Sequence, residues 1–127
     1  MSPVKQIVLV GHCAADCRML KSAIERATPG VAVRSVGDMK ALETLALACC
    51  LLLINRVLSS GWPASAGVEL IKLLKASPLP PAMMLLSDFP DAQQQAEAAG
   101  AMPGFGKSEL GGEKMTQRLQ AALGPGL

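Results

Sequence analysis

Five short apolar runs alternate with five segments of helical spacing along this chain, and this alternation restricts the possible folds more than any other feature of the sequence. The first run, Ile-Val-Leu-Val at residues 7–10, is typical of a strand covered on both faces. In the next segment Leu20, Ile24 and Ala27 recur at intervals of four and three residues, which predicts a helix. Strands joined by helices pair in parallel through right-handed crossovers. We therefore expect an α/β fold, a (βα)5 doubly wound, five-stranded parallel sheet with helices on both faces.

The same patterns predict where each strand and helix begins and ends. The expected strands cover residues 7–10, 31–36, 49–54, 82–86 and 101–105, and the expected helices cover residues 14–27, 39–48, 67–76, 91–99 and 113–123. Asp38 is a suitable N-cap for the second helix, and Gly100 stands where a glycine commonly follows the end of a helix. With no internal repeat and no long linker, residues 1–127 are expected to form a single domain.

The composition argues against several classes of function. Twelve basic and ten acidic residues give a formal net charge of +2, and no cluster of Lys and Arg marks a nucleic-acid-binding surface. Only three aromatic side chains are present for bases to stack on. No apolar stretch approaches the roughly 20 residues of a membrane-spanning helix, and the first residues lack the pattern of a signal peptide. We therefore expect a cytoplasmic protein with reduced cysteines and with no nucleic-acid or membrane partner.

The residues that follow the strands define the candidate site. In open α/β sheets, ligands bind beyond the carboxyl ends of the strands, near the point where the strand order reverses. The residues expected there are Gly11, His12, Cys13, Asn55, Arg56, Ser87, Asp88, Gly106 and Lys107. Gly11 is a lone glycine, without the Gly-x-Gly-x-x-Gly pattern of a dinucleotide site, so we expect no cofactor.

Several short motifs coincide with those of one known family. The apolar runs at residues 7–10 and 51–54 match its first and third strands, and Gly-Val-Glu-Leu-Ile at residues 67–71 matches the start of its third helix. Met-Met-Leu-Leu-Ser at residues 83–87 matches its fourth strand, and Gly100-Ala101 followed by Lys107 matches its last strand and its lysine. Over nearly its whole length the chain resembles the receiver domain of bacterial two-component response regulators. The resemblance implies the flavodoxin-like receiver fold, with Ser87 as the switch residue and Lys107 as the family's invariant lysine.

The chain departs from the receiver pattern at the positions that carry the family's chemistry. Gly11 and His12 stand where the family has an acidic pair, Asn55 stands where it has the phosphoacceptor aspartate, and Ser108 replaces the proline that usually follows the lysine. An amide oxygen is a poor nucleophile, and an imidazole is a poor ligand for Mg²⁺. We therefore interpret the chain as a pseudo-receiver. This is a phosphorylation-independent signalling module, with neither enzymatic activity nor a bound metal, that acts by protein–protein interaction.

The resemblance also implies where a partner would bind. A signalling protein or a second copy of the chain would contact the fourth helix, the fifth strand and the fifth helix, roughly residues 91–123. The loop after Asn55 is about four residues longer than is usual for the family, which is a notable length for a loop. Trp62 in this loop is either an anchor for a partner or a cover folded back over its own domain.

Polar side chains near the strand tips support smaller hypotheses. Asn55 either hydrogen-bonds Lys107 and locks one conformer, or is a polar remnant at a strand tip. Without a phosphoryl group, Lys107 is expected to be a solvated amine. Asp16 and Asp88 could rebuild a weak cation site, although the position of Asp16 in a helix disfavours it.

Two alternatives to the pseudo-receiver are left open. The first is a thiol-based redox sensor centred on Cys13, because helix N-termini favour the reactive thiolate form of cysteine. Cys17 lies one helical turn further on, too far for an unstrained disulfide, and Cys49-Cys50 begins a buried strand. The second alternative is a conventional phosphate-relay receiver that uses an unusual site, with His12 as the candidate acceptor.

Overall fold

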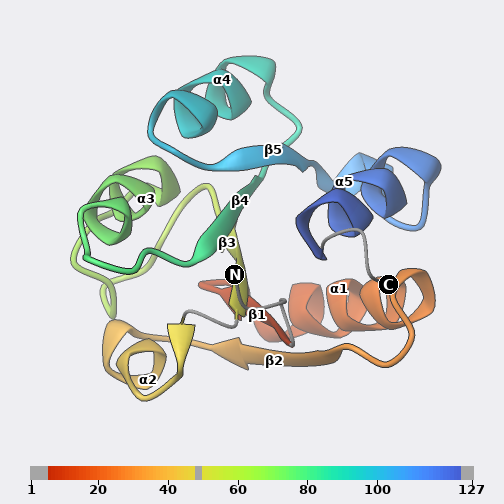
Figure 1. Ribbon diagram of the computed structural model, residues 1–127, viewed down its shortest axis with the longest axis horizontal. Coiled ribbons are helices and arrows are strands. Elements are labelled where there is room, and N and C mark those ends of the chain that lie inside the picture. The colour runs from red at the N-terminus through yellow and green to blue at the C-terminus, as the bar shows by residue number, and fades with distance from the viewer. Residues whose placement is uncertain (1–5, 48–49, 124–127) are drawn as a thin grey trace.

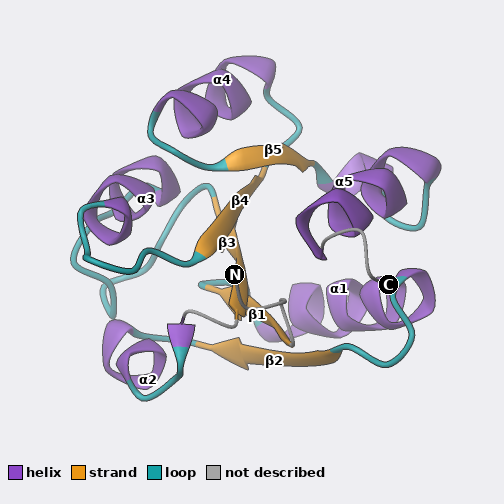
Figure 2. Cartoon of the chain, viewed as in Figure 1, coloured by secondary structure: helices purple, strands orange, loops and turns teal. Residues whose placement is uncertain are grey.

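The computed structural model describes residues 6–47 and 50–123, which form a single five-stranded parallel sheet with helices on both faces (Figures 1 and 2). The order of the strands across the sheet is β2-β1-β3-β4-β5. The strands are β1 (Gln6–Val10), β2 (Ala32–Val36), β3 (Cys50–Asn55), β4 (Ala82–Leu86) and β5 (Met102–Phe105). The helices are α1 (Ala14–Ala27), α2 (Met39–Glu43), α3 (Gly67–Lys75), α4 (Pro90–Ala98), α5 (Glu113–Leu123) and the 3-10 turn η2 (Lys107–Glu109). The predicted fold class and strand number are confirmed.

Two apolar layers hold the helices against the sheet, one on each face. Val8 and Val10 of β1 point to the layer under α2, α3 and α4. Ile7 and Leu9, the alternate residues of the same strand, point to the layer under α1 and α5. Successive side chains of a strand face opposite sides, so a strand that is apolar at every position must be covered on both. The continuous run at residues 7–10 therefore lies inside the sheet, as its composition predicts.

The edge strand β2 differs from the central strands in burial. Its residues are exposed or half-buried throughout, whereas β1, β3 and β4 are almost completely buried. A strand with only one neighbour is covered less well than one enclosed by two, which explains the mixed composition of residues 32–36.

Local hydrogen bonds explain both ends of α2. Asp38 caps α2 as predicted, because its carboxylate accepts a hydrogen bond from Ala41 N at 2.8 Å. The prediction that this helix continues to Ala48 was wrong. The helix ends at Glu43, and the hydroxyl of Thr44 donates to the carbonyl of Ala41 at 2.7 Å, which closes the last turn. Ala48 and Cys49, expected at a helix end and a strand start, lie outside the described residues.

Within residues 6–47 and 50–123, no helix has the length and apolar character needed to cross a membrane.

Candidate functional site

The carboxyl ends of β3, β4 and β5 surround a pocket of about 300 Å³, which we call the tip pocket. Three of the five residues expected in the degenerate phosphorylation site, Asn55, Ser87 and Lys107, line this pocket together. The other lining residues are Arg56, Val57, Leu86, Asp88 and Phe89. Gly11 and His12 do not line it. Topology alone brings the three lining residues together, because parallel strands end at the same edge of the sheet.

Both the nitrogen and the oxygen of the Asn55 side chain are hydrogen-bonded to nearby backbone groups. Its amide nitrogen donates to the carbonyl of Gly11 at 3.2 Å and to the carbonyl of Val57 at 3.1 Å. Its amide oxygen accepts a hydrogen bond from Arg56 N at 3.1 Å. The structure contains no hydrogen bond between Asn55 and Lys107. The contact that would lock one conformer is therefore not formed. Asn55 instead ties β3 to the end of β1 and to the loop that follows it.

Lys107 makes an ion pair with Asp16, which reaches across from α1. The Lys107 side chain is 48% exposed, in line with the expected solvated amine, but it also has a partner that the sequence did not indicate. Hydrogen bonding to the Lys107 ammonium lowers the pKa of the Asp16 carboxyl below its usual value. The pair links α1 to the segment after β5, and the ammonium is neutralised by a carboxylate of the chain itself.

His12 turns away from the tip pocket toward the interior. Its Nε2 lies 2.9 Å from the carbonyl of Leu53, and because a carbonyl can only accept, Nε2 carries the proton and donates. The other ring nitrogen, Nδ1, is buried and has no hydrogen-bond partner. Burial lowers the pKa of His12 below its ordinary value of 6.5, which favours the neutral ring. Neither nitrogen is presented to a phosphoryl donor in this arrangement.

Asp88 and Ser108 form a clamp across the last two strand tips. The Oδ1 of Asp88 accepts hydrogen bonds from the Ser108 hydroxyl at 2.6 Å and from Ser108 N at 3.2 Å. A proline at this position has neither an N–H nor a hydroxyl to donate, so the departure from the family pattern supplies both bonds. Gly106 permits the approach, since a Cβ there would lie only 1.8 Å from the same oxygen. Ser87 is buried beside the clamp and its hydroxyl accepts from Phe89 N at 3.1 Å.

The loop between β3 and α3, residues 56–66, folds back over the end of β1. Leu58 and Trp62 are each only 6% exposed and pack in the core. A Cβ on Gly11 would lie 2.5 Å from Leu58 Cδ2 and 3.5 Å from Trp62 Nε1, so this loop occupies the space where a side chain at residue 11 would stand. An anchor for a partner must be exposed, whereas Trp62 covers its own domain. Its indole N–H is buried without a hydrogen-bond partner.

The cysteines differ sharply in environment. Cys13 is exposed and caps α1, where its sulfur accepts a weak hydrogen bond from Asp16 N at 3.5 Å. Cys17 is half-buried and its thiol donates to the carbonyl of His12 at 3.6 Å. Burial raises the pKa of the Cys17 thiol. Cys50 is buried at the start of β3, where packing explains its position.

The tip residues do not fit a Mg²⁺ ion. Mg²⁺ in proteins is held by oxygen ligands, one or two of them carboxylates. The amide oxygen of Asn55 is engaged by Arg56 N, and the acidic side chains at this edge are committed to other partners, Asp16 to Lys107 and Asp88 to Ser108. Among the residues that the structure describes, no three His, Cys, Asp or Glu side chains gather closely enough to hold a metal.

Two features of this edge of the sheet carry no signal in the sequence. The guanidinium of Arg56 lies over the Phe89 ring, 4.8 Å from its centre, and both residues line the tip pocket. Gln93 of α4 donates to the carbonyls of Leu85 and Ser87, at 2.9 and 3.0 Å, and accepts from Gly104 N at 3.2 Å. Both contacts depend on how the chain folds, so no sequence motif predicts them.

Comparison with known proteins supports the fold. No family model matches the chain, and no curated protein matches it. Several solved structures share its architecture at low identity, including the following three. The signal receiver domain of a DNA-binding response regulator from Colwellia psychrerythraea 34H is 16% identical, with a TM-score of 0.68 over 90% of this chain and 94% of that chain. The chemotaxis response regulator CheY4 of Vibrio cholerae is 15% identical, with a TM-score of 0.67 over 94% and 99%. NtrX from Brucella abortus is 20% identical, with a TM-score of 0.71 over 97% of this chain and 27% of that chain.

These likenesses define a class of fold. The described chain has the five-stranded, flavodoxin-like (βα)5 fold of receiver domains. At identities of 20% or less, the likeness bears on the architecture alone.

Proposed function

We propose that this chain is a receiver-like signalling module that works without phosphorylation and without enzymatic activity, by binding other proteins. The observation that carries the proposal is the internal satisfaction of the tip pocket. The amide of Asn55 is bonded to Gly11 and Val57, and the ammonium of Lys107 is bonded to Asp16. A phosphoryl group would have to displace these contacts, and the one carboxylate that lines the pocket, Asp88, is held by Ser108. The pocket therefore offers neither a free carboxylate nucleophile nor a Mg²⁺ ligand set.

The proposed contact surface consists of α4, β5 and α5, with a signalling protein or a second copy of the chain as the partner. One structural neighbour is described as the beryllofluoride-activated NtrC4 receiver domain dimer, which supports self-association as one form of contact for this fold. In the present chain the surface does not depend on an activating group, because Gln93 already fixes α4 to β4 and β5 through three hydrogen bonds.

Backbone amide NMR of the full chain during titration with Mg²⁺ and beryllofluoride tests the proposal. We expect no saturable shift at Gly11, Asn55, Ser87 or Lys107. The Asn55→Asp variant is the matched comparison, and a response in that variant alone would place the loss of function at residue 55. Saturable shifts at the strand tips of the native chain would overturn the proposal, because they would reveal a working metal and phosphate site.

A thiol-based redox sensor is the second candidate, favoured by the exposure of Cys13 at the start of α1. The rate of alkylation, measured between about pH 6 and about pH 9, distinguishes the two. A rate already at its plateau near neutral pH in the native chain and in Cys17→Ser, and lost in Cys13→Ser, supports the sensor. A rate that keeps rising with pH, as for an ordinary thiol, contradicts it.

A further inference from the structure

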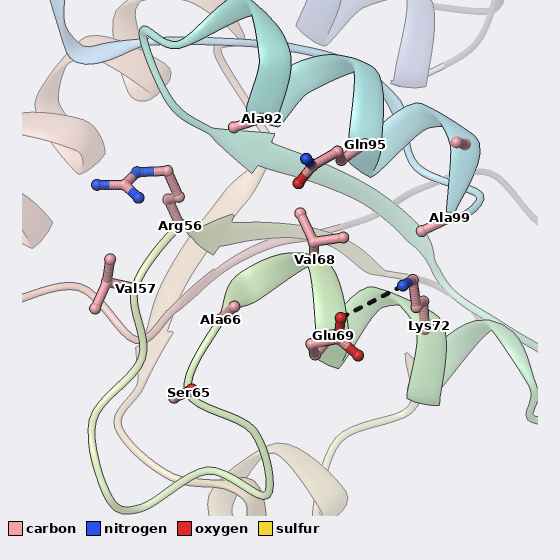
Figure 3. A pocket seen from close by; sticks show the side chains of 11 residues that line it. Arg56, Val57, Ser65, Ala66, Val68, Glu69, Lys72, Ala92, Gln95 and Ala99 are labelled. Carbon is pink, nitrogen blue, oxygen red and sulfur yellow. Dashed lines mark hydrogen bonds and ion pairs between the residues drawn. The ribbon is translucent and has the colours of Figure 1, made fainter.

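A groove separates α3 from α4 on the face of the sheet opposite α1 and α5 (Figure 3). Its volume is about 580 Å³, enough to receive several side chains of a partner. Residues from both ends of the β3–α3 loop and from the facing sides of the two helices line it. They are Arg56, Val57, Ser65, Ala66, Val68, Glu69, Lys72, Ala92, Gln95, Ala98 and Ala99.

Three alanines and Gln95 form the wall contributed by α4 and the residue that follows it. Ala92 and Ala99 face the groove, and Val68 of α3 adds an apolar surface opposite them (Figure 3). Ala98 also lines the groove. Short side chains leave a helix surface that another helix can approach closely. Apolar grooves of this kind between helices typically receive the apolar face of an amphipathic helix.

The charges at the rim are unequal. Arg56 and Lys72 are positive and Glu69 is negative, which leaves an excess of one positive charge among the lining residues. Lys72 binds Glu69 at 3.4 Å with both side chains more than half exposed, a pair that contributes little (Figure 3). Within the described part of the chain, the guanidinium of Arg56 has no carboxylate partner and stacks only on Phe89. Arg56 is therefore available to a carboxylate from outside.

Exposed apolar side chains surround Arg56. Val57, which lines the groove, is 56% exposed, and Phe89 beneath the guanidinium is 57% exposed. An arginine framed by exposed apolar groups is a common composition for the centre of a protein interface. The mouth of the groove thus combines apolar area with one unpaired positive charge.

We propose that the α3–α4 groove binds an amphipathic helix of a partner protein, whose apolar stripe lies along the alanines of α4 and whose Asp or Glu pairs with Arg56. The carboxylate would accept two parallel hydrogen bonds from the guanidinium fork. This groove shares α4 with the α4–β5–α5 surface but uses the side of α4 that faces α3, so the groove can fail its test while the phosphate-independent module stands, and the reverse also holds.

A displayed library of helical peptides, randomised on one face and selected against the full chain, tests the groove. We expect the enriched peptides to carry apolar residues at helical spacing and a carboxylate at one end. Their binding should shift the amides of Val57, Val68, Ala92 and Ala99. The Arg56→Glu variant should bind them about tenfold more weakly or worse, because a charge-assisted pair becomes a repulsion.

Matched variants guard against a loss of folding. Ala98 is exposed and lines the groove, whereas its neighbour Glu97 is exposed on the same helix and does not. Ala98→Phe should abolish binding and Glu97→Phe should retain it, with equal thermal midpoints. Arg34→Glu on the edge strand, the control for the charge reversal, should bind normally. The proposal is overturned if no peptide is enriched, if the two Phe variants bind alike, or if the selected peptides show no preference for a carboxylate.

Discussion

At the scale of single residues, the polar side chains at the strand tips are bonded to nearby backbone groups or to other side chains, at the positions where a receiver would hold a metal and a phosphoryl group. His12 is the exception, because its Nδ1 lies in the interior with no partner. An unpaired buried nitrogen is tolerated while the ring is neutral but becomes costly when the ring takes up a second proton. The environment of His12 therefore couples folding to pH.

We expect the free energy of unfolding to fall as the pH drops below about 6.5, the unfolded-state value. The folded-state pKa of His12 is lower than 6.5, so in this window the unfolded chain binds more protons and stability is lost with falling pH until the folded-state pKa is passed. The slope for one group is at most about 1.4 kcal/mol per pH unit. Urea unfolding at several pH values measures this slope in the native chain and in the His12→Gln variant, which keeps a hydrogen-bond donor for the carbonyl of Leu53. Equal slopes near pH 6 would contradict this role of His12.

Gly11 offers a second test at this scale. Its φ of +76° is in the left-handed region, and a Cβ would meet the buried Leu58 at 2.5 Å. Gly30 has a φ of +90° but nothing within 4 Å of the same position. Gly30→Ala should cost about 1–2 kcal/mol from backbone strain alone. Gly11→Ala should cost roughly 1–3 kcal/mol more because of overpacking. Chemical denaturation of both variants measures the difference, and similar losses would show that Leu58 moves freely.

At the scale of elements, the β3–α3 loop behaves as a packed part of the domain. Leu58 N donates to the carbonyl of Ser65 at 2.9 Å, and Gly67 N donates to the carbonyl of Arg56 at 2.8 Å, which closes the base of the loop. Met39 N of α2 donates to the carbonyl of Gly61 at 3.0 Å, which ties the loop to a second element. The loop thus packs over β1 and also forms one border of the α3–α4 groove.

Trp62 carries the packing of this loop, and its ring matters more than its N–H. Trp62→Ala should cost about 3–5 kcal/mol because it leaves a cavity beside Gly11. Trp62→Phe should cost much less, because the lost indole N–H donates to no group in the structure. Thermal and denaturant unfolding of the two variants compares them. Equal losses would mean that the indole N–H makes a contact that matters.

The sequence predicted most elements because their apolar patterns are strong. The strands at residues 82–86 and 7–10 appear at the expected positions to within one residue, since central parallel strands must be apolar on both faces. The early end of α2 escaped prediction because it depends on the hydroxyl of Thr44, a local bond without a distinct pattern. For the site, strand topology predicted that Asn55, Ser87 and Lys107 meet. It could not predict the partner of Lys107, because Asp16 is 91 positions away and only the packing of α1 brings it there.

At the scale of the whole molecule, stability is concentrated in the centre of the sheet. β1 and β3 each have a strand on both sides and an apolar layer on both faces. β2 has one neighbour and lies at the edge beside α2, a helix of only five residues. The described chain is therefore expected to open at one edge before it unfolds as a whole.

Amide hydrogen exchange followed by NMR tests this order. Amides of β1, β3 and β4 should exchange only through global unfolding, with protection equal to the full free energy of unfolding. Amides of β2 and α2 should exchange through smaller openings and be less protected. A mildly destabilising core variant such as Ile71→Val should reduce protection in the central strands by its full cost, about 0.5–1.5 kcal/mol. Equal protection in β2 and β3 would contradict a separate opening of the edge.

The burial of Trp62 also gives the molecule a built-in optical reporter. It is the sole tryptophan of the chain, so tryptophan fluorescence reports on a single ring, which packs near the end of β1. The wavelength of the emission maximum depends on the polarity around that ring. It should increase when the loop moves away and exposes the ring to water. Because Val57 and Ser65 of the same loop border the α3–α4 groove, a partner that moves the loop on binding should change the fluorescence of the unlabelled protein.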